Sequence, residues 1–162
     1  GGYAASPRLN LAFAYSFNRA IYKEFDKGPC APEVDPATAT VCSFTGKQLS
    51  GAPKHTANIT IDFNSPLTHG YIGHTSLSES YRSSANVSAV LSDYGWQKAY
   101  SIVDAVIGVS TANQRYDLSL IGKNVFDTKY ITLTGDGSSS KLLETAASGE
   151  RRSINLVFRA KL

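Results

Sequence analysis

Side chains along most of this chain alternate between bulky apolar and small polar types with a period of two. From Leu9 to Phe17 every second residue is large and apolar, Ile21 continues that face, and Asn, Ala or Ser stand between. Side chains of a β-strand point alternately to opposite faces, so the spacing predicts a strand with one apolar and one polar face. The same alternation, weaker in the second of them, predicts strands in five later segments: residues 56–64, 71–82, 103–110, 116–120 and 153–162.

These segments predict an all-β fold with about six long strands and no helix. Strands of soluble domains usually run about five or six residues, whereas a tilted transmembrane strand needs roughly 9–11. The polar faces carry Ser, Asn, Thr, Ala and Gly with few charges, which is typical of a wide aqueous lumen. We therefore expect a segment of an antiparallel transmembrane β-barrel. A soluble β-sandwich binding module is the alternative.

The connections between the predicted strands alternate in length. Short turns fall at residues 64–70 and 112–114, whereas the links at residues 23–54, 83–99 and 128–151 are long. Outer-membrane barrels have short periplasmic turns and long extracellular loops. The pattern predicts that the first strand begins, and the last strand ends, on the periplasmic side.

Aromatic side chains fit the same picture. Tyr71 and Tyr81 share one face of a predicted strand, and their spacing corresponds to about 25 Å along the membrane normal. This is the height of the apolar band that aromatic girdles flank in such barrels. We expect Phe63 and Tyr116 in the lower girdle and Phe126 in the upper one.

The two cysteines, Cys30 and Cys42, lie in a proline-rich stretch of small residues. No CxxC motif or neighbouring histidine accompanies them, so a metal site is not expected. A disulfide that closes the loop is favoured, with a contribution of ~3 kcal/mol to stability, and it implies an oxidising compartment. Two free thiols in a cytosolic loop are the alternative.

Composition excludes several classes of function. The 162 residues carry a net charge of +3 without basic clusters, so no nucleic-acid partner is expected. The longest apolar run is far shorter than the roughly 20 residues of a membrane-spanning helix. No hydrolase, phosphate-binding or EF-hand motif is present, so we expect no enzyme activity, no cofactor and no metal.

Three motifs carry a resemblance to TonB-dependent outer-membrane receptors. Residues 122–130 read GKNVFDTKY and resemble the Asn-Leu-Phe-Asp-x-x-Tyr signature near the end of that family. Residues 49–58 resemble its Gly-x-Pro-Lys-x-Thr-x-Asn start of a descending strand, and residues 149–156 resemble its last loop and final strand. The signature positions are Asn124, Phe126, Asp127 and Tyr130.

The resemblance implies a 22-stranded barrel with an N-terminal plug that contacts the TonB system. Residues 1–162 are then expected to be the C-terminal portion of the barrel, without the plug, whose edge strands pair with the remaining barrel strands. The implied function is active uptake of a scarce solute such as an iron-siderophore across the bacterial outer membrane. A passive porin-type fragment is the alternative. The family usually ends in an aromatic residue, and Leu162 departs from this.

Candidate ligand contacts come from the polar faces and the long loops. Arg82 ends a polar strand face and is suited to an anionic ligand, while Tyr94, Trp96 and Tyr130 offer stacking surfaces. The alternative is that Arg82 pairs with an acid of a neighbouring strand and that the aromatic rings pack the loops or contact lipopolysaccharide. His74 faces the presumed lumen and is expected to be a hydrogen-bonding wall residue.

Overall fold

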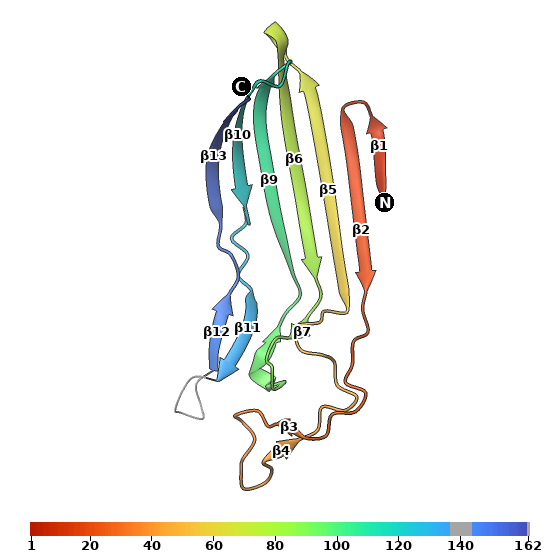
Figure 1. Ribbon diagram of the computed structural model, residues 1–162, viewed down its shortest axis with the longest axis vertical. Helices are drawn as coiled ribbons and strands as arrows, with labels where there is room; N and C mark the ends of the chain where they lie inside the picture. Colours follow the sequence, from red (N-terminus) through yellow and green to blue (C-terminus); the bar gives the residue numbers. More distant parts are fainter. Residues whose placement is uncertain (137–143, 162) are drawn as a thin grey trace.

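One antiparallel sheet of seven strands dominates the computed structural model, which describes residues 1–136 and 144–161 (Figure 1). Each strand pairs with the next long strand along the chain, so the sheet is an up-and-down meander. None of the described helices is long or apolar enough to cross a membrane. In sheet order the strands are β1 (Gly2–Ser6), β2 (Leu9–Phe17), β5 (His55–Pro66), β6 (Tyr71–Arg82), β9 (Tyr100–Thr111), β10 (Tyr116–Lys123) and β13 (Ser153–Ala160).

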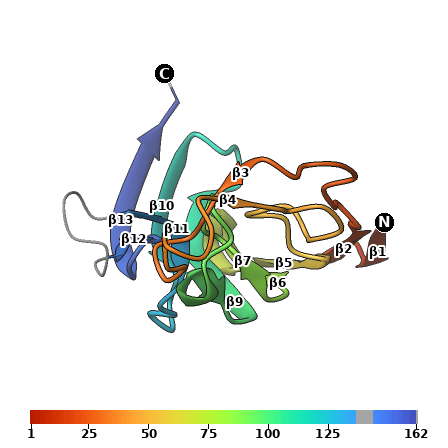
Figure 2. The same ribbon diagram turned by 90° about the horizontal axis from the view of Figure 1, so that it is seen from below.

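The sheet is a single curved layer with two unlike faces. Seen along its long axis it forms an arc, and the loop that carries the short strands β3 and β4 lies on the inner side of the arc (Figure 2). Directly opposed residues share a face, and the strand registers give continuous cross-strand rows. One row of the apolar face is Leu9, Phe63, Thr75, Ile107, Leu120 and Leu156, and one row of the polar face is Ala12, Thr60, Ser78 and Asp104.

No second layer covers the apolar face within the described residues. Phe13 is 53% exposed, Ile107 61% and Leu156 71%. An apolar surface of this extent is unfavourable in water, because monomeric soluble proteins rarely expose contiguous patches larger than a few hundred Å². The soluble β-sandwich would need that face packed against a second sheet, which the described chain does not provide.

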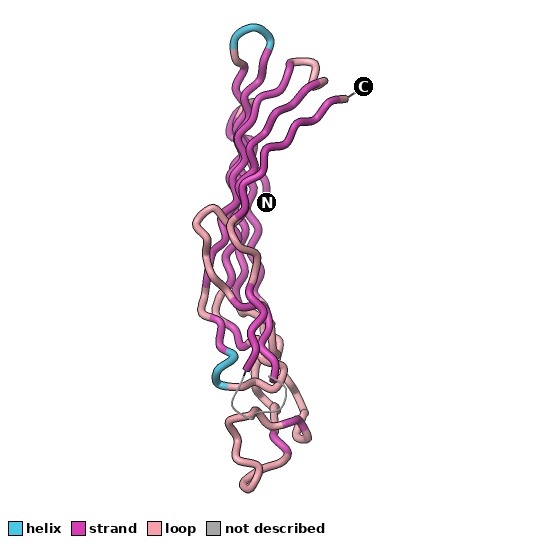
Figure 3. The backbone as a smooth tube through the Cα atoms, turned by 90° about the vertical axis from the view of Figure 1, so that its left-hand side faces the viewer, coloured by secondary structure: helices cyan, strands magenta, loops and turns pink. Residues whose placement is uncertain are grey.

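Short and long connections segregate to opposite ends of the sheet (Figures 1 and 3). We call one the turn end, where residues 7–8, 67–70 and 112–115 join neighbouring strands. The 67–70 turn contains the short 3-10 helix η1 (Thr68–Gly70), in which His69 and Gly70 have positive φ. The other is the loop end, where residues 18–54, 83–99, 124–136 and 144–152 lie. The predicted alternation of connection lengths is confirmed.

Strand β1 was not predicted. Its five residues include only one large apolar side chain, Tyr3, so no alternation is visible in the sequence. Pairing with β2 through Gly2–Ala12, Tyr3–Leu11 and Ala4–Asn10 holds it at the sheet edge. The sequence predicted that the first strand of the chain begins at the turn end. Instead, the chain reaches the turn end along β1, and β2 is the first strand that begins there.

Several strands are shorter than the predicted segments. Strand β2 ends at Phe17, and Ile21 instead forms an isolated bridge with Gln48. Strand β13 has eight residues and ends at Ala160, two residues before the predicted end. Strand β10 instead extends three residues beyond its predicted segment, to Lys123. Strand β10 ends where Asn124 adopts φ 45°, a left-handed conformation that a strand cannot continue through. Leu162 lies outside the described residues.

The long loops contain structure that the sequence did not predict. Residues 128–151 were predicted only as a long link, but they contain a hairpin that extends below β10 and β13 (Figure 1). Its short alternation of Ile131, Thr132, Leu133 and Thr134 was too brief to be read as a strand. The additional elements are β3 (Gly28–Pro29) with β4 (Val41–Cys42), β7 (Ala85–Asn86) with β8 (Trp96–Gln97), η2 (Asp93–Gly95), and β11 (Ile131–Asp136) with β12 (Glu144–Ser148).

The Asn-Val-Phe-Asp motif forms the junction between β10 and these extensions. Asn124 is 2% exposed, and its side-chain amide donates to the carbonyl oxygens of Thr128 and Glu150, both at 2.9 Å. Its Oδ1 accepts from the Thr128 N–H at 2.9 Å, and its own N–H donates to Asp104 Oδ1 at 2.8 Å. One asparagine therefore ties β9, β10 and the start of β13 together.

Asp127 completes this junction from the surface. Its carboxylate accepts from the Arg152 N–H at 3.2 Å and pairs with the Arg151 guanidinium at 3.2 Å. These two donors hold the pKa of Asp127 below its ordinary value. Asn124 and Asp127 thus have a structural role here, whereas Phe126 is 74% exposed.

We predict that Asn124→Ala lowers the free energy of unfolding by about 2–4 kcal/mol, because it removes three hydrogen bonds that a buried side chain makes to Thr128 and Glu150. Chemical unfolding of the protein in a lipid bilayer measures this. Asn155→Ala is the matched control, since Asn155 is exposed on β13 and makes no side-chain hydrogen bond in the described part of the chain. Equal losses in the two variants would contradict the structural role of the motif.

Candidate functional site

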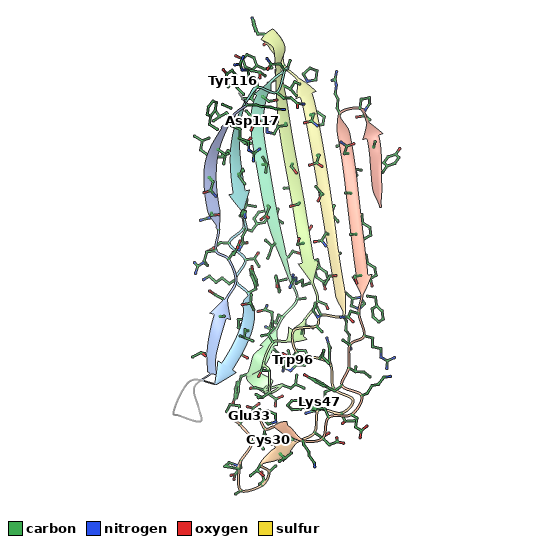
Figure 4. The ribbon with its side chains drawn as sticks, viewed as in Figure 1. Cys30, Glu33, Lys47, Trp96, Tyr116 and Asp117 are labelled. Carbon is green, nitrogen blue, oxygen red and sulfur yellow. A yellow bond between two sulfur atoms is a disulfide. The ribbon has the colours of Figure 1, made fainter. Side chains whose placement is uncertain are left out.

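The three long loops interlock at the loop end. Glu33, from the loop at residues 18–54, reaches the loop at residues 83–99. Its Oε1 accepts from the Asp93 N–H at 2.6 Å, and its Oε2 accepts from the Ser92 hydroxyl at 3.1 Å. Figure 4 shows Glu33 beside Cys30 at the loop end, opposite Tyr116 and Asp117 at the turn end.

The loop at residues 18–54 has a small core of its own. Tyr22, Phe25 and Phe44 pack together with ring centroids 5.4–5.6 Å apart, and Phe44 is 2% exposed. Cys30 and Cys42 form a disulfide beside this cluster with their Cα atoms 5.0 Å apart, so the predicted pairing is confirmed. Three residues after Cys30, Glu33 is thus presented by a constrained loop.

The loop at residues 83–99 folds around two buried polar side chains. Asn86 donates to the Ser92 carbonyl at 2.7 Å and accepts from the Ser88 N–H at 2.9 Å. Ser92 is fully buried, and its hydroxyl accepts from the Tyr94 N–H while it donates to Glu33. A Cβ at Gly95 would collide with Ser88, so the close turn requires glycine.

The third loop joins the same assembly. Ser88 forms a parallel bridge with Thr134 of β11, and the Ile131 N–H donates to Gln97 Oε1 at 2.7 Å. The N–H of Gly51 donates to the Asn86 carbonyl at 2.8 Å. Hydrogen bonds therefore join all three loops at the loop end.

Beneath these loops the polar face carries a hollow of about 330 Å³, which we call the polar-face hollow. Two cations, two carboxylates and two phenol rings border it, a mixture suited to a polar ligand with both charged and aromatic parts. These residues are Arg82, Lys123, Asp104, Glu150, Tyr100 and Tyr130.

The two tyrosines form a stacked pair at this hollow. The rings of Tyr100 and Tyr130 are 4.6 Å apart at the centroids and 16° from parallel. The Tyr130 hydroxyl accepts from the Glu150 N–H at 3.1 Å, and Tyr130 lies against Gly149, where any Cβ would overlap its ring. Tyr130 is therefore fixed in place by the last loop.

Arg82 lies directly across from Tyr100 on the polar face. No carboxylate of the described residues lies within 4 Å of its guanidinium. Guanidinium groups bind carboxylates and phosphates through paired hydrogen bonds and stack on aromatic rings. Arg82 and the Tyr100–Tyr130 pair can thus contact an anionic ligand with a planar group.

The four predicted ligand-contact residues do not form one cluster. Arg82 and Tyr130 meet at the polar-face hollow. Trp96 borders a second hollow that Tyr130 also borders, together with Glu79 and Val103 of the apolar face. Tyr94 is 72% exposed on η2. Sequence reasoning missed Tyr100, whose partner in the stack is thirty residues away.

A second polar cluster lies near the turn end. His74 Nε2 is 3.1 Å from Ser119 Oγ and 3.4 Å from Asp117 Oδ2, while the Ser119 hydroxyl donates to Asp117 Oδ1 at 2.7 Å. His74 is therefore a hydrogen-bonding residue of the polar face, as the sequence predicted. The strand registers place it between Asn64 and Gly108, and only a glycine leaves room for the ring.

This cluster lacks the geometry of a proton relay. A catalytic triad binds the carboxylate at Nδ1 and the serine at Nε2, whereas here both partners contact Nε2. In addition, the Ser119 hydroxyl donates its hydrogen bond to Asp117 and not to His74. The arrangement cross-links β6 and β10 across the polar face. The described residues contain no group of three His, Cys, Asp or Glu side chains that could hold a metal ion.

Comparison with known proteins finds similarity to solved structures. No family model matches the sequence, and no curated protein matches it either. The crystal structure of the ferric yersiniabactin uptake receptor FyuA from Yersinia pestis is similar, with a TM-score of 0.72 and 14% sequence identity. The match covers 98% of this chain and 22% of that receptor. The chain thus spans about a fifth of the receptor and has the fold of a receptor β-barrel segment.

We predict that Glu33→Gln loosens the contact between the loops. Partial burial raises the pKa of Glu33, but hydrogen bonds from the Asp93 N–H and the Ser92 hydroxyl outweigh this, and the pKa lies below its ordinary value of 4.5. The carboxylate form is thus stabilised in the folded loop. Removing its charge is expected to lower the hydrogen-exchange protection of residues 88–97 about five- to tenfold.

The sign of the pH effect follows from the lowered pKa. The contact is present above pH 4.5 and is lost as the pH falls through the folded pKa of Glu33, so wild-type protection should drop in that window. Glu33→Gln should show no such step. The matched control is Glu24→Gln, an exposed acid in the same loop. Equal protection in Glu33→Gln and Glu24→Gln would contradict the proposed contact.

Proposed function

We propose that this chain forms part of the barrel wall and the extracellular loops of a TonB-dependent outer-membrane receptor that takes up a scarce solute, such as an iron-siderophore. The observation that carries the proposal is the single-layer, two-faced sheet with segregated turns and loops, which matches an uptake receptor over 98% of the chain. The Asn124–Tyr130 signature and the other family motifs support it independently.

In this proposal the apolar face borders lipid and the polar face borders the lumen. The exposed side chains of the apolar face then contact hydrocarbon rather than water, which removes the cost of leaving them uncovered. Aromatic residues lie near both ends of that face, with Tyr116 stacked on Phe158 at the turn end and Tyr81 at the loop end. This arrangement suits an outer-membrane location.

The sheet edges define the first partners. Strands β1 and β13 each pair on one side only within the described chain. Unpaired backbone groups are prohibitively costly in hydrocarbon, so both edges require neighbouring barrel strands. We propose that the same receptor supplies these strands, together with a plug that links the lumen to the TonB system.

The loop end is the proposed site of solute binding. Its three loops are held together by the Glu33 contacts and the Asn86–Ser92 core, and they stand over the polar-face hollow with Arg82 and the stacked tyrosines. A rigid, concave site with a guanidinium and aromatic rings favours an anionic solute with a planar group. We propose a binding role rather than catalysis for these residues.

Energy-dependent uptake tests the proposal. Cells that produce the complete receptor are offered iron-labelled complexes of carboxylate, catecholate and hydroxamate siderophores. We expect saturable uptake of one of these classes that disappears when the TonB system is deleted. Uptake that is linear with concentration and unaffected by that deletion would contradict active transport and favour a passive porin.

We predict that Arg82→Gln weakens binding of the transported complex about ten- to a hundredfold, because a charge-assisted hydrogen bond is lost. Binding to cells without the TonB system measures this step apart from transport. Arg19→Gln is the control, since it removes the same charge from an exposed position of a neighbouring loop. Unchanged affinity in Arg82→Gln would place the solute elsewhere in the receptor.

A further inference from the structure

The stacked tyrosines are a shared wall of two hollows at the loop end. Tyr100 and Tyr130 border the polar-face hollow of about 330 Å³ and also the second hollow, of about 1000 Å³. Glu150 borders the first of these hollows, and its neighbour Gly149 borders the second. The shape of the polar-face hollow therefore depends on where the last loop holds the Tyr130 ring.

The last loop holds Tyr130 by its backbone and by its side chain. The Gly149 N–H donates to the Tyr130 carbonyl oxygen at 2.8 Å, and the Glu150 N–H donates to the Tyr130 hydroxyl at 3.1 Å. The ring also fills the space that a Cβ at Gly149 would occupy. The φ of Gly149 is not positive, so its backbone conformation is open to alanine. The close approach of the ring, and not the path of the chain, therefore requires glycine here.

The Asn-Val-Phe-Asp motif anchors the same segment from its other side. The Asn124 side-chain amide donates to the carbonyl oxygen of Glu150 and to that of Thr128, which lies two residues before Tyr130. The Asn124 N–H is itself bound to Asp104 of β9. Because β9 also carries the other ring of the stack, the motif sets Tyr130 relative to the strand of its partner.

The position of the Tyr130 ring matters for a ligand of the polar-face hollow. Tyr100 belongs to β9 and lies across from Arg82 of β6, so two registered strands fix their spacing. Tyr130 lies outside the strands, and its place in the stack depends on the contacts of the last loop. A ring that is already in place favours binding, because no side chain has to be ordered when the ligand arrives.

We propose that Gly149 is a positioning residue for solute binding, which acts by leaving room for Tyr130 to stack on Tyr100 at the polar-face hollow. The inference rests on the proposed function and deepens it. It gives the last loop, anchored by Asn124, a role in the affinity for the solute. In this role Gly149 acts through the Tyr130 ring and not through a contact of its own.

A double-mutant cycle in the complete receptor tests the proposal. The probes are iron-labelled complexes of a carboxylate, a catecholate and a hydroxamate siderophore, bound to cells without the TonB system. We expect Gly149→Ala to weaken the tightest of these complexes about five- to tenfold, because the added methyl displaces the ring from the stack. In a Tyr130→Ala background that ring is absent, so Gly149→Ala should change the affinity by less than about twofold.

The matched control is Gly135→Ala, which adds the same methyl to the same loop where a Cβ meets nothing within 4 Å. It should bind the complexes as the wild type does. Nuclear magnetic resonance of labelled tyrosines reads the stack without any solute, through the ring-current shift that one ring causes in the other. Gly149→Ala should reduce this shift at Tyr100, and Gly135→Ala should leave it unchanged.

Tyr130→Phe is a second variant, which keeps the ring and removes only the acceptor of the Glu150 N–H. It should reduce the ring-current shift in part. An unchanged shift in both Gly149→Ala and Tyr130→Phe would overturn the positioning role.

The binding results separate this inference from the proposed function. Equal losses from Gly149→Ala in the two backgrounds, or none in either, would overturn the positioning role and leave the solute site standing. Wild-type affinity in Tyr130→Ala, or a wild type that binds none of the three complexes, would overturn the role together with the tyrosines as solute contacts. The expected cycle without TonB-dependent uptake would overturn only the transport proposal.

Discussion

The fold depends on the environment of one sheet that is apolar on one side and polar on the other. Its strands satisfy their backbone groups laterally, but no second layer in the described residues buries the rows that contain Phe13, Ile107 and Leu156. In the proposed membrane placement, a hydrocarbon solvent on that side resolves the imbalance, since apolar residues then face lipid and the Ser, Thr and Asn rows face water. The same constraint requires closure, because neither β1 nor β13 can end the sheet in lipid.

The proposed binding function is assigned to the loop end because the strands of the wall offer few specific contacts. The disulfide loop presents Glu33 to Ser92 and Asp93, and the Asn124 junction sets the start of the last loop. Arg82 and the tyrosine stack border the polar-face hollow. The tyrosine stack also borders a second hollow, which Trp96 and Phe126 line together with Glu79 and Val103 of the apolar face.

Long strands could be predicted from the sequence, whereas short ones could not. The alternation over β5 and β6 spans enough residues to predict both strands and the face on which Arg82 lies. Strands β1 and β11 have too few alternating side chains to be predicted. The Glu33–Ser92 contact joins residues fifty-nine apart and depends on loop conformations that leave no periodic signal. The Tyr100–Tyr130 stack likewise depends on the bend at Asn124 and on Gly149. The alternation of side chains along the strands therefore could not predict that the two rings stack.

Solvent accessibility along β6 in a bilayer tests the central claim most directly. Spin labels placed one at a time at positions 75, 76, 77 and 78 of the complete receptor report collisions with oxygen, which dissolves in lipid, and with a water-soluble nickel complex. Positions 75 and 77 should favour oxygen and positions 76 and 78 the nickel complex, because Thr75 and Leu77 share the apolar face. Equal accessibility at all four positions, or the opposite alternation, would contradict a sheet that separates lipid from water.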